Sequence, residues 1–121
     1  MSRAVVFGAG GIGRGFVGAL FGSAGWRVTF VDVAEPLVAR LAADGRYRQV
    51  VVRDDGETFV EIPGVDALLL GDEAAVVGAL IDADIVATAV GAENLPPVAR
   101  LLAAGLEARA GRVGPVGRAR V

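Results

Sequence analysis

The sequence predicts an α/β fold with a doubly wound, mostly parallel sheet and an inserted β-hairpin. Short valine-rich runs alternate with longer segments of helical period, and a glycine cluster separates the first run from the first helix. The length of 121 residues, 54% of them hydrophobic, suits a single domain. We expect the parallel strands to lie in the order 3-2-1-4, with a right-handed crossover between neighbours.

The N-terminal quarter has the order strand, helix, strand. Residues 3–7 form an apolar run that stops at glycine, which is typical of a strand buried on both faces. Residues 11–24 are apolar at nearly every position and Gly25 follows, which predicts a covered helix with a glycine C-cap. Residues 27–32 are β-branched or aromatic and end in an acid. Together they have the size of a βαβ unit.

Four glycines recur at helical spacing within the first predicted helix. They are Gly11, Gly15, Gly18 and Gly22. Glycine inside a helix costs about 1 kcal/mol relative to alanine, so the pattern indicates either close packing by something outside this chain or a glycine-tolerant composition. We favour the composition.

A hairpin interrupts the alternation after the second helix. Residues 35–43 predict that helix, which Asp44 and Gly45 close. Residues 47–53 and 58–62 are strand-like runs around the turn at residues 54–57, where an Asp-Gly pair can supply a positive φ. We interpret these two runs as an inserted hairpin.

The remaining pattern predicts two further strands and two helices. Residues 66–70 and 85–90 are the strands, and residues 73–80 and 94–110 are the helices. After position 110 the period fails and glycine and arginine dominate. We therefore expect a cofactor-binding domain over residues 1–110, a frayed tail over residues 111–121, and an incomplete C-terminal half of the sheet.

Composition excludes several kinds of chemistry. All 12 basic residues are arginine, and lysine, histidine and cysteine are absent, so no thiol nucleophile, imidazole base, lysine Schiff base, disulfide or zinc finger can form. A net charge of −2 gives no footprint of a nucleic-acid binder. The longest stretch without a charged residue, residues 15–26, is too short for a membrane span, and no secretory signal opens the chain. We expect a cytoplasmic protein.

The glycine cluster matches a nucleotide-binding pattern. Gly8, Gly10 and Gly13 follow the first predicted strand in the spacing G-x-G-x-x-G and open the first predicted helix. The first allows a tight turn, the second lets the backbone approach a pyrophosphate, and the third lets the helix pack close to the sheet. The N–H groups at the helix start can bind an anion without a lysine. The neighbouring Arg14 is either a contact to the pyrophosphate or a solvated charge.

An acid at the end of the second predicted strand supports the same interpretation. Asp32 lies nineteen residues beyond Gly13, close to the spacing of about 20 at which an acid accepts hydrogen bonds from the adenosine ribose. A carboxylate there repels a 2′-phosphate, so NAD is favoured over NADP. The alternative for Asp32 is to cap the helix that begins near Glu35.

Three segments resemble one enzyme family. Residues 7–16, 29–33 and 88–91, in that order, resemble the N-terminal Rossmann domain of the mannitol-1-phosphate 5-dehydrogenases in the mannitol dehydrogenase family. These enzymes oxidise mannitol 1-phosphate to fructose 6-phosphate with NAD. The resemblance covers residues 4–110, hairpin included. It implies that the cofactor is bound by Phe7, Gly8, Ala9, Gly10, Gly11, Ile12, Gly13, Arg14, Gly15 and Asp32, with Thr88, Ala89 and Val90 beside it.

The sequence also departs from that family. The resemblance places the catalytic lysine in a C-terminal helical domain, and this chain has no lysine. We expect a truncated or frame-shifted N-terminal piece that binds NAD(H) without activity of its own, and that meets a sugar-alcohol phosphate only with the missing domain supplied. We assign no catalytic residue and no metal ligand. Tyr47 is interpreted as a packing or rim residue, and Asn94 as a helix cap.

Three other functions share some of these features. The first is a free-standing NAD-sensing regulatory module, which needs no catalytic base, although a frayed tail and an open sheet edge argue against it. The second is an adenylating enzyme of the ubiquitin-activating type, whose second strand continues into motifs that the residues after Asp32 lack. The third is a methyltransferase, which the third glycine of the pattern disfavours.

Overall fold

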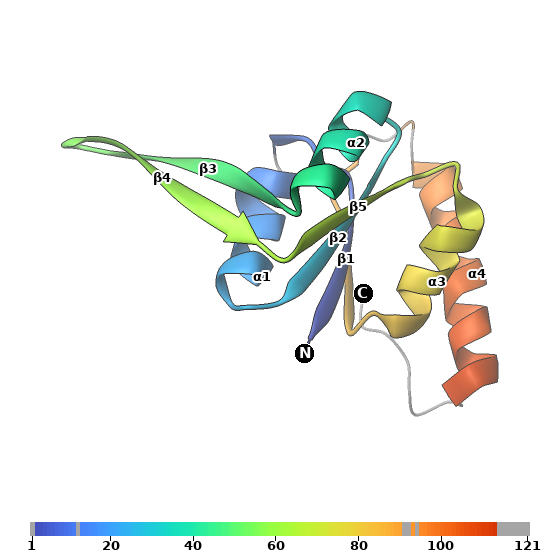
Figure 1. Cartoon of the computed structure of the whole chain (residues 1–121). Coiled ribbons are helices and arrows are strands. Elements are labelled where there is room, and N and C mark those ends of the chain that lie inside the picture. Colours follow the sequence, from blue (N-terminus) through green and yellow to red (C-terminus); the bar gives the residue numbers. More distant parts are fainter. Residues whose placement is uncertain (1, 12, 91–92, 94, 114–121) are drawn as a thin grey trace.

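A computed structural model describes residues 2–11, 13–90, 93 and 95–113 of the chain. Figure 1 shows a central sheet with helices on both sides and a hairpin that extends away from it. The elements, in chain order, are β1 (Arg3–Phe7), the π-helical turn η1 (Gly13–Gly18), α1 (Ala19–Ser23), β2 (Arg27–Asp32), α2 (Glu35–Asp44), β3 (Arg46–Arg53), β4 (Gly56–Pro63), β5 (Val65–Leu69), α3 (Glu73–Asp82), β6 (Ile85–Thr88) and α4 (Leu95–Val113).

The central sheet has the order β5-β2-β1-β6, and all of its neighbouring strands are parallel. Val6 in β1 lies opposite Phe30 in β2 on one side and Ala87 in β6 on the other. The order 3-2-1-4 predicted for the parallel strands is confirmed, because β5 and β6 are the third and fourth of them along the chain. Continuous apolar runs suit these strands, since both faces of the sheet are covered.

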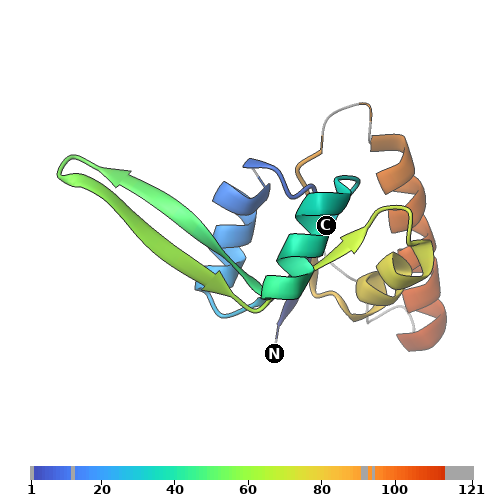
Figure 2. The same ribbon diagram turned by 45° about the horizontal axis from the view of Figure 1, so that its top comes forward.

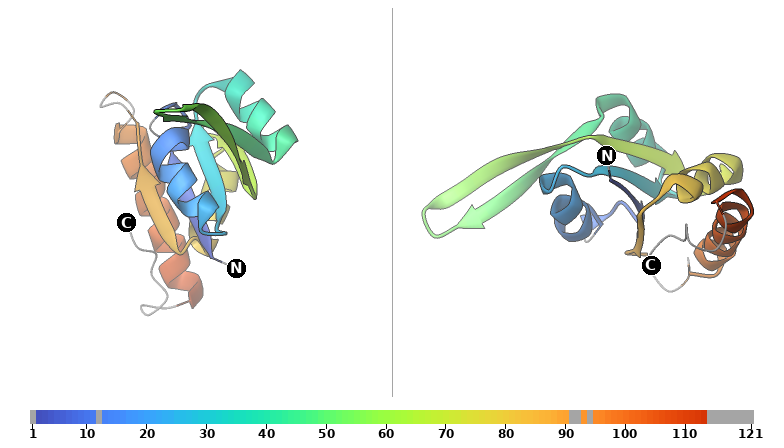
Figure 3. Two further views of the ribbon diagram at one scale, coloured as in Figure 1. Left: turned by 90° about the vertical axis from the view of Figure 1, so that its left-hand side faces the viewer. Right: turned by 90° about the horizontal axis from the view of Figure 1, so that it is seen from below.

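Two hydrophobic layers enclose the sheet, which confirms the doubly wound arrangement. On one face Val38 and Leu41 of α2 pack with Phe30 of β2. On the other face Val76 of α3 and Val98 of α4 pack against the opposite side of the same sheet. The right-hand view of Figure 3 shows α3 and α4 together, away from α1 and α2. Because the strands are parallel, their carboxyl ends share one edge of the sheet, and the helices cover its two faces.

The first helical segment is not the single α-helix that the sequence predicts over residues 11–24. It begins as the π-helical turn η1 and becomes α-helical only at Ala19. The hairpin supplies the physical reason. Tyr47 Oη donates a hydrogen bond of 2.6 Å to the carbonyl oxygen of Arg14, and Gln49 Nε2 donates one of 2.7 Å to the carbonyl oxygen of Gly15. Donors that insert from outside in this way compete with the regular helical ladder and widen the turn.

Two of the four glycines in this segment are required by packing within the chain. A Cβ on Gly18 would lie 2.5 Å from Phe30 Cζ and 2.8 Å from Tyr47 Oη. A Cβ on Gly22 would lie 2.3 Å from Ile62 Cγ2. The interpretation as a glycine-tolerant composition is therefore wrong at these positions. The close neighbours are Phe30 of β2 and the root of the hairpin, and not a partner outside the chain.

The inserted hairpin is confirmed as β3 and β4, which pair antiparallel with Val50 opposite Phe59. Gly56 has φ +130°, so the Asp-Gly turn uses glycine as the sequence predicts. The hairpin reaches away from the body (Figure 2), and Phe59 keeps 59% of its surface exposed. At the root, Tyr47 and Ile62 are buried in the core between the hairpin and the sheet. The hairpin is thus anchored at one end.

Boundaries near the C-terminus differ slightly from expectation. Strand β6 ends at Thr88, two residues before the predicted end, and α4 continues to Val113, three residues past it. Residues 111–113 of the expected tail thus belong to α4, and residues 114–121 and the predicted cap Asn94 lie outside the described residues. Within the part of the chain that the structure describes, no helix is both long and apolar enough to cross a bilayer.

Candidate functional site

The glycine segment lies where three parallel strands end. The N–H of Gly8 donates a hydrogen bond of 2.7 Å to the carbonyl oxygen of Val31, and the N–H of Ala89 donates one of 2.7 Å to that of Phe7. Gly8 has φ +104°, and a Cβ there would lie 2.5 Å from the carbonyl oxygen of Ala89. Only glycine allows this turn, because a side chain would be both strained and blocked.

The other two glycines of the pattern have different surroundings. A Cβ on Gly13 would lie 2.0 Å from the carbonyl oxygen of Gly8, so the third glycine brings the helical turn against the loop. Around Gly10, by contrast, nothing lies within 4 Å of the Cβ position. The backbone at Gly10 is therefore open on the side where a Cβ would stand. An open, Cβ-free loop at the end of β1 fits the pyrophosphate of a dinucleotide.

Asp32 is fixed by two backbone donors. Its Oδ2 accepts a hydrogen bond of 2.7 Å from the N–H of Ala9, and its Oδ1 accepts one of 3.0 Å from the N–H of Ala34. The α2 helix has no side-chain N-cap hydrogen bond, so the alternative of Asp32 as its cap is wrong. A carboxylate accepts about four hydrogen bonds, and these two donors leave capacity for ribose hydroxyls.

A cavity of about 140 Å³ opens beside Asp32. Of the residues proposed for the cofactor, Gly8, Asp32, Ala89 and Val90 line it. Its other lining residues are Val31, Val33, Leu70 and Val98. Asp32 is the one ionisable side chain among these eight, so the cavity combines a carboxylate with apolar walls. A cavity of this size can border an apolar group beside a hydroxyl-bearing one, and its lining supplies no second acid or base.

Four of the lining residues were not predicted as site residues, namely Val31 and Val33, which flank Asp32 in sequence, and Leu70 and Val98. Leu70 follows β5, and its N–H donates a hydrogen bond of 3.0 Å to the carbonyl oxygen of Asp32. The rule that places Asp32 at the carboxyl end of a parallel strand also applies to Leu70, and could have found it. Val98 lies on α4, and it reaches the cavity through helix packing that no sequence pattern indicates.

Several other predicted cofactor residues do not line the cavity beside Asp32. Phe7 and Ala9 are fully buried, main chain included, so they support the loop and present no exposed atom to a ligand. Gly11 and Gly15 are exposed, and Thr88 is exposed without lining the cavity. Ile12 lies outside the described residues.

Arg14 turns back onto the glycine loop. Its Nε donates a hydrogen bond of 2.6 Å to the carbonyl oxygen of Ala9, and its side chain lines a second hollow instead of the cavity beside Asp32. The hairpin holds the same residue from the other side through Tyr47, whose hydroxyl binds the Arg14 carbonyl. Burial raises the pKa of Tyr47 to about 12, against the opposing charge of Arg14. The hydroxyl therefore stays a donor at physiological pH.

These features define a class of protein. A parallel sheet in this order, with a glycine turn after β1 and an oriented acid after β2, forms a Rossmann-type dinucleotide-binding domain. Residues 2–115 match the family described as the mannitol dehydrogenase Rossmann domain. The chain belongs to this family. The match confirms the resemblance seen in the sequence and, through the Rossmann fold, the expected cofactor class of NAD(P).

Curated relatives agree with this family. The chain is 44% identical over 109 residues to the mannitol-1-phosphate 5-dehydrogenase of Shouchella clausii, covering 88% of this chain and 29% of the relative. It is 46% identical over 108 residues to that of Geobacillus thermodenitrificans, covering 88% and 28%. It is 44% identical over 115 residues to that of an Arthrobacter species, covering 94% and 30%. The chain thus spans less than a third of the length of these relatives.

A solved structure shows the same fold. A Rossmann-fold NAD(P)-binding family protein from Shigella flexneri superposes with a TM-score of 0.55 at 19% identity. The superposition covers 89% of this chain and 47% of that protein. At this identity the likeness concerns the fold.

Proposed function

We propose that this chain is the NAD-binding domain of a polyol-phosphate dehydrogenase that interconverts mannitol 1-phosphate and fructose 6-phosphate. The names of the relatives support this reaction, because three mannitol-1-phosphate 5-dehydrogenases share 44–46% of residues with the chain. The chain matches less than a third of each relative, so the reaction belongs to a longer protein and the chain contributes the cofactor site. Because NAD and sugar phosphates are held inside cells, we propose a cytoplasmic site for this function.

The observation that carries the cofactor assignment is the orientation of Asp32. The N–H groups of Ala9 and Ala34 hold both oxygens of the carboxylate, and Asp32 lines the cavity. The 2′ and 3′ hydroxyls of an adenosine ribose can donate to its remaining lone pairs. A 2′-phosphate in the same place would meet a like charge, so NAD is preferred over NADP.

The remaining parts of the site fit the rest of a dinucleotide. Apolar walls from Val33, Leu70 and Val98 suit an adenine ring beside the ribose. The open backbone at Gly10 can approach the pyrophosphate. Bound NAD supplies the hydride acceptor for alcohol oxidation. That oxidation also needs a base at the substrate hydroxyl, and we assign none in this chain.

Fluorescence titration with NADH and NADPH tests the proposal. We expect NADH to bind more tightly than NADPH, and Asp32→Asn to weaken NADH about tenfold, because a hydrogen bond to a charged acceptor is lost. The matched control is Asp55→Asn, which removes one exposed carboxylate at the hairpin turn and should change nothing. Equal NADH affinity in Asp32→Asn and the parent would exclude the ribose contact.

A turnover assay tests the limit of the proposal. The 121-residue chain should bind NADH without oxidising mannitol 1-phosphate, because we assign it no base. Oxidation at the rate of ordinary enzymes would show that a base exists among its carboxylates or its single tyrosine.

A further inference from the structure

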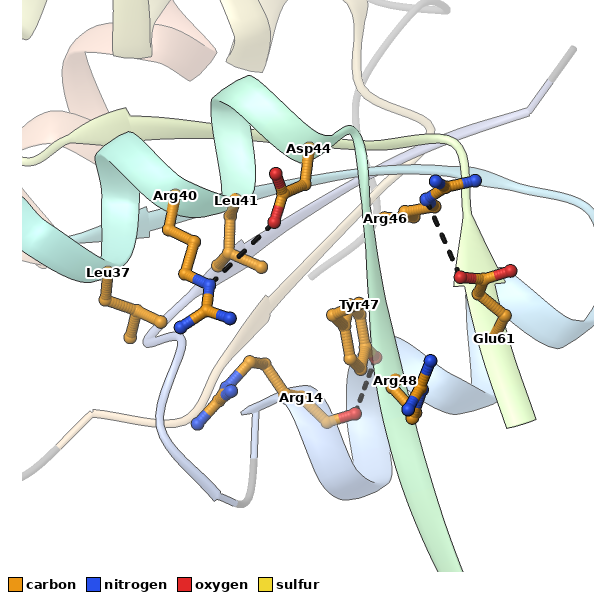
Figure 4. A pocket seen from close by; sticks show the side chains of 9 residues that line it. All are labelled: Arg14, Leu37, Arg40, Leu41, Asp44, Arg46, Tyr47, Arg48 and Glu61. Atoms are coloured by element: carbon orange, nitrogen blue, oxygen red, sulfur yellow. Dashed lines mark hydrogen bonds and ion pairs between the residues drawn. The ribbon is translucent and has the colours of Figure 1, made fainter. Parts of the chain in front are cut away.

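The hairpin has two faces with different surroundings. Residues opposite each other in an antiparallel pair lie on one face, and the faces alternate along each strand. Tyr47 lies opposite Ile62, and both are buried in the core, so their side is the inner face. Figure 4 shows that Tyr47 reaches toward Arg14, whereas Arg48 lies on the other side of β3. That other side is the outer face, and its residues are Arg46, Arg48, Val50 and Val52 of β3 and Glu57, Phe59, Glu61 and Pro63 of β4.

The middle of the outer face is apolar and exposed. Val50 lies opposite Phe59, and their exposed fractions are 48% and 59%. Val52, nearer the turn, is 75% exposed. A two-stranded hairpin is marginally stable in water unless one of its faces packs against something. Covering these three side chains would therefore stabilise the hairpin itself, because their apolar surface would leave water.

Charge on the outer face is divided between the two strands. Its basic residues, Arg46 and Arg48, lie on β3, and its acidic residues, Glu57 and Glu61, lie on β4. Arg46 Nε lies 3.6 Å from Glu61 Oε1, and both side chains are more than half exposed. An exposed ion pair of this kind contributes little to stability, so its members can take other partners at small cost. The outer face thus has a basic side, an apolar middle and an acidic side.

A twofold axis that runs along the hairpin makes the outer face complementary to itself. Rotation about this axis lays β3 of one copy over β4 of the other. The register then sets Arg48 against Glu61 of the second copy, and Val50 against its Phe59. Each contact occurs twice in such an interface. A twofold axis across the strands would instead lay β4 on β4 and bring acids together, so the axis along the hairpin is favoured.

We propose that the outer face binds a second copy of this chain, giving a twofold dimer whose hairpins lie face to face. The rest of the domain does not obstruct this contact. Helix α1 lies on the inner side, because Gly22 packs closely against Ile62. The two domains therefore lie on opposite sides of the paired hairpins. A face of this size belongs to the small interfaces of transient complexes, so we expect a dimer that dissociates at micromolar concentration.

Sedimentation velocity of the 121-residue chain, from about 1 µM to about 500 µM, tests the proposal. We expect the mass to rise from that of one chain to that of two and to stop there. A monomer at every concentration would overturn the proposal. Continued growth beyond two copies would indicate nonspecific association and overturn it as well. The cavity beside Asp32 has no lining residue from the hairpin, so excess NADH should leave the result unchanged, whether or not the cofactor proposal holds.

Charge reversal tests the twofold arrangement. Arg48→Glu or Glu61→Arg alone sets like charges against each other twice, so each should weaken the dimer at least tenfold. An equal mixture of the two variants restores opposite charges at both contacts and should form a mixed dimer with nearly the affinity of the parent. Failure of the mixture to recover would overturn the arrangement. The control is Arg27→Glu, which reverses an exposed arginine of the central sheet and should not change the dissociation constant.

Two matched variants distinguish the faces of the hairpin. Val50→Thr and Val60→Thr keep the branched side chain that suits a strand, and both valines are nearly half exposed, so neither should change the melting temperature of dilute protein. Val50→Thr puts a hydroxyl into the outer face and should weaken the dimer several-fold. Val60 lies on the inner face, opposite Gln49, and its variant should dimerise like the parent. Equal effects of the two would contradict the assignment of the outer face.

Discussion

The hydroxyl of Tyr47 on β3 donates a 2.6 Å hydrogen bond to the main-chain carbonyl oxygen of Arg14 in η1, across 33 positions of sequence. The same arginine binds the carbonyl oxygen of Ala9 through its side chain. The hairpin root is therefore connected to the glycine loop by two successive hydrogen bonds. An insertion that lies outside the central sheet thus helps to position the loop at the carboxyl end of β1.

Replacing Tyr47 by phenylalanine should destabilise the domain by about 1 kcal/mol. The ring and its packing against Phe30 would remain, while the carbonyl oxygen of Arg14 would lose its donor. Urea unfolding followed by circular dichroism measures this difference. Unchanged stability would show that the hydrogen bond from Tyr47 to the Arg14 carbonyl oxygen does not stabilise the domain.

Alkaline pH should destabilise the parent through the same side chain. Burial raises the pKa of Tyr47 to about 12, whereas an unfolded tyrosine titrates near 10. The folded state therefore holds the proton more tightly, and this stabilisation is complete below pH 10 and is lost as pH rises through 12. The chain has one tyrosine and no lysine or cysteine, so few other groups titrate in this window.

The size and assignment of this alkaline effect can be measured in one pair of proteins. We expect the free energy of unfolding of the parent to fall by about 2 kcal/mol between pH 10 and 12. The fall should be absent in Tyr47→Phe. Equal pH dependence in the two proteins would assign the effect to another group.

Alanine at Gly13 should damage both folding and cofactor binding. Its Cβ would lie 2.0 Å from the carbonyl oxygen of Gly8, so the loop and η1 would have to separate. We expect a loss of several kcal/mol, as for other overpacked buried sites. The control is Gly15→Ala in the same turn, where nothing lies within 4 Å of the Cβ position. Thermal melts should distinguish the two, and similar melting temperatures would contradict the close packing.

Alanine at Gly10 should affect the ligand alone. No protein atom lies within 4 Å of a Cβ at this position, so the melting temperature should match that of the parent. A pyrophosphate that approaches the backbone there would meet the added methyl group, and NADH should bind at least tenfold more weakly. Parent-like affinity for NADH would show that the cofactor does not approach Gly10.

The strands could be predicted because their signals are local. Residues 4–7 are a continuous apolar run and residues 28–31 are β-branched or aromatic, and a strand buried on both faces needs nothing more specific. The turn at Gly56 was equally local. The π-helical turn was not, because its cause is a hydroxyl 33 positions away that reaches the Arg14 carbonyl. The close fit of Gly18 against Phe30 also depends on tertiary packing, so composition gave a wrong explanation of it.

In the candidate site, too, some residues could be predicted from the sequence and others depend on tertiary packing. Gly8 and Asp32 could be placed together because the carboxyl ends of parallel strands share one edge of a sheet, and the family resemblance added Ala89. Val98 could not, since its position depends on how α4 packs over that edge. The contact between Arg14 and Ala9 was also missed, because a side chain that turns back to its own loop leaves no periodic signal.

The two backbone hydrogen bonds to Asp32 have a consequence for discrimination between ligands. A carboxylate on a freely rotating side chain could turn away from the 2′-phosphate of NADP. The protein would then still bind NADP through its other contacts. Here rotation would break the bonds from both Ala9 and Ala34, so the negative charge is rigid. Selectivity for the unphosphorylated ribose would then come from the fixed position of the carboxylate as well as from its charge. A more flexible backbone between β2 and α2 would lower this selectivity.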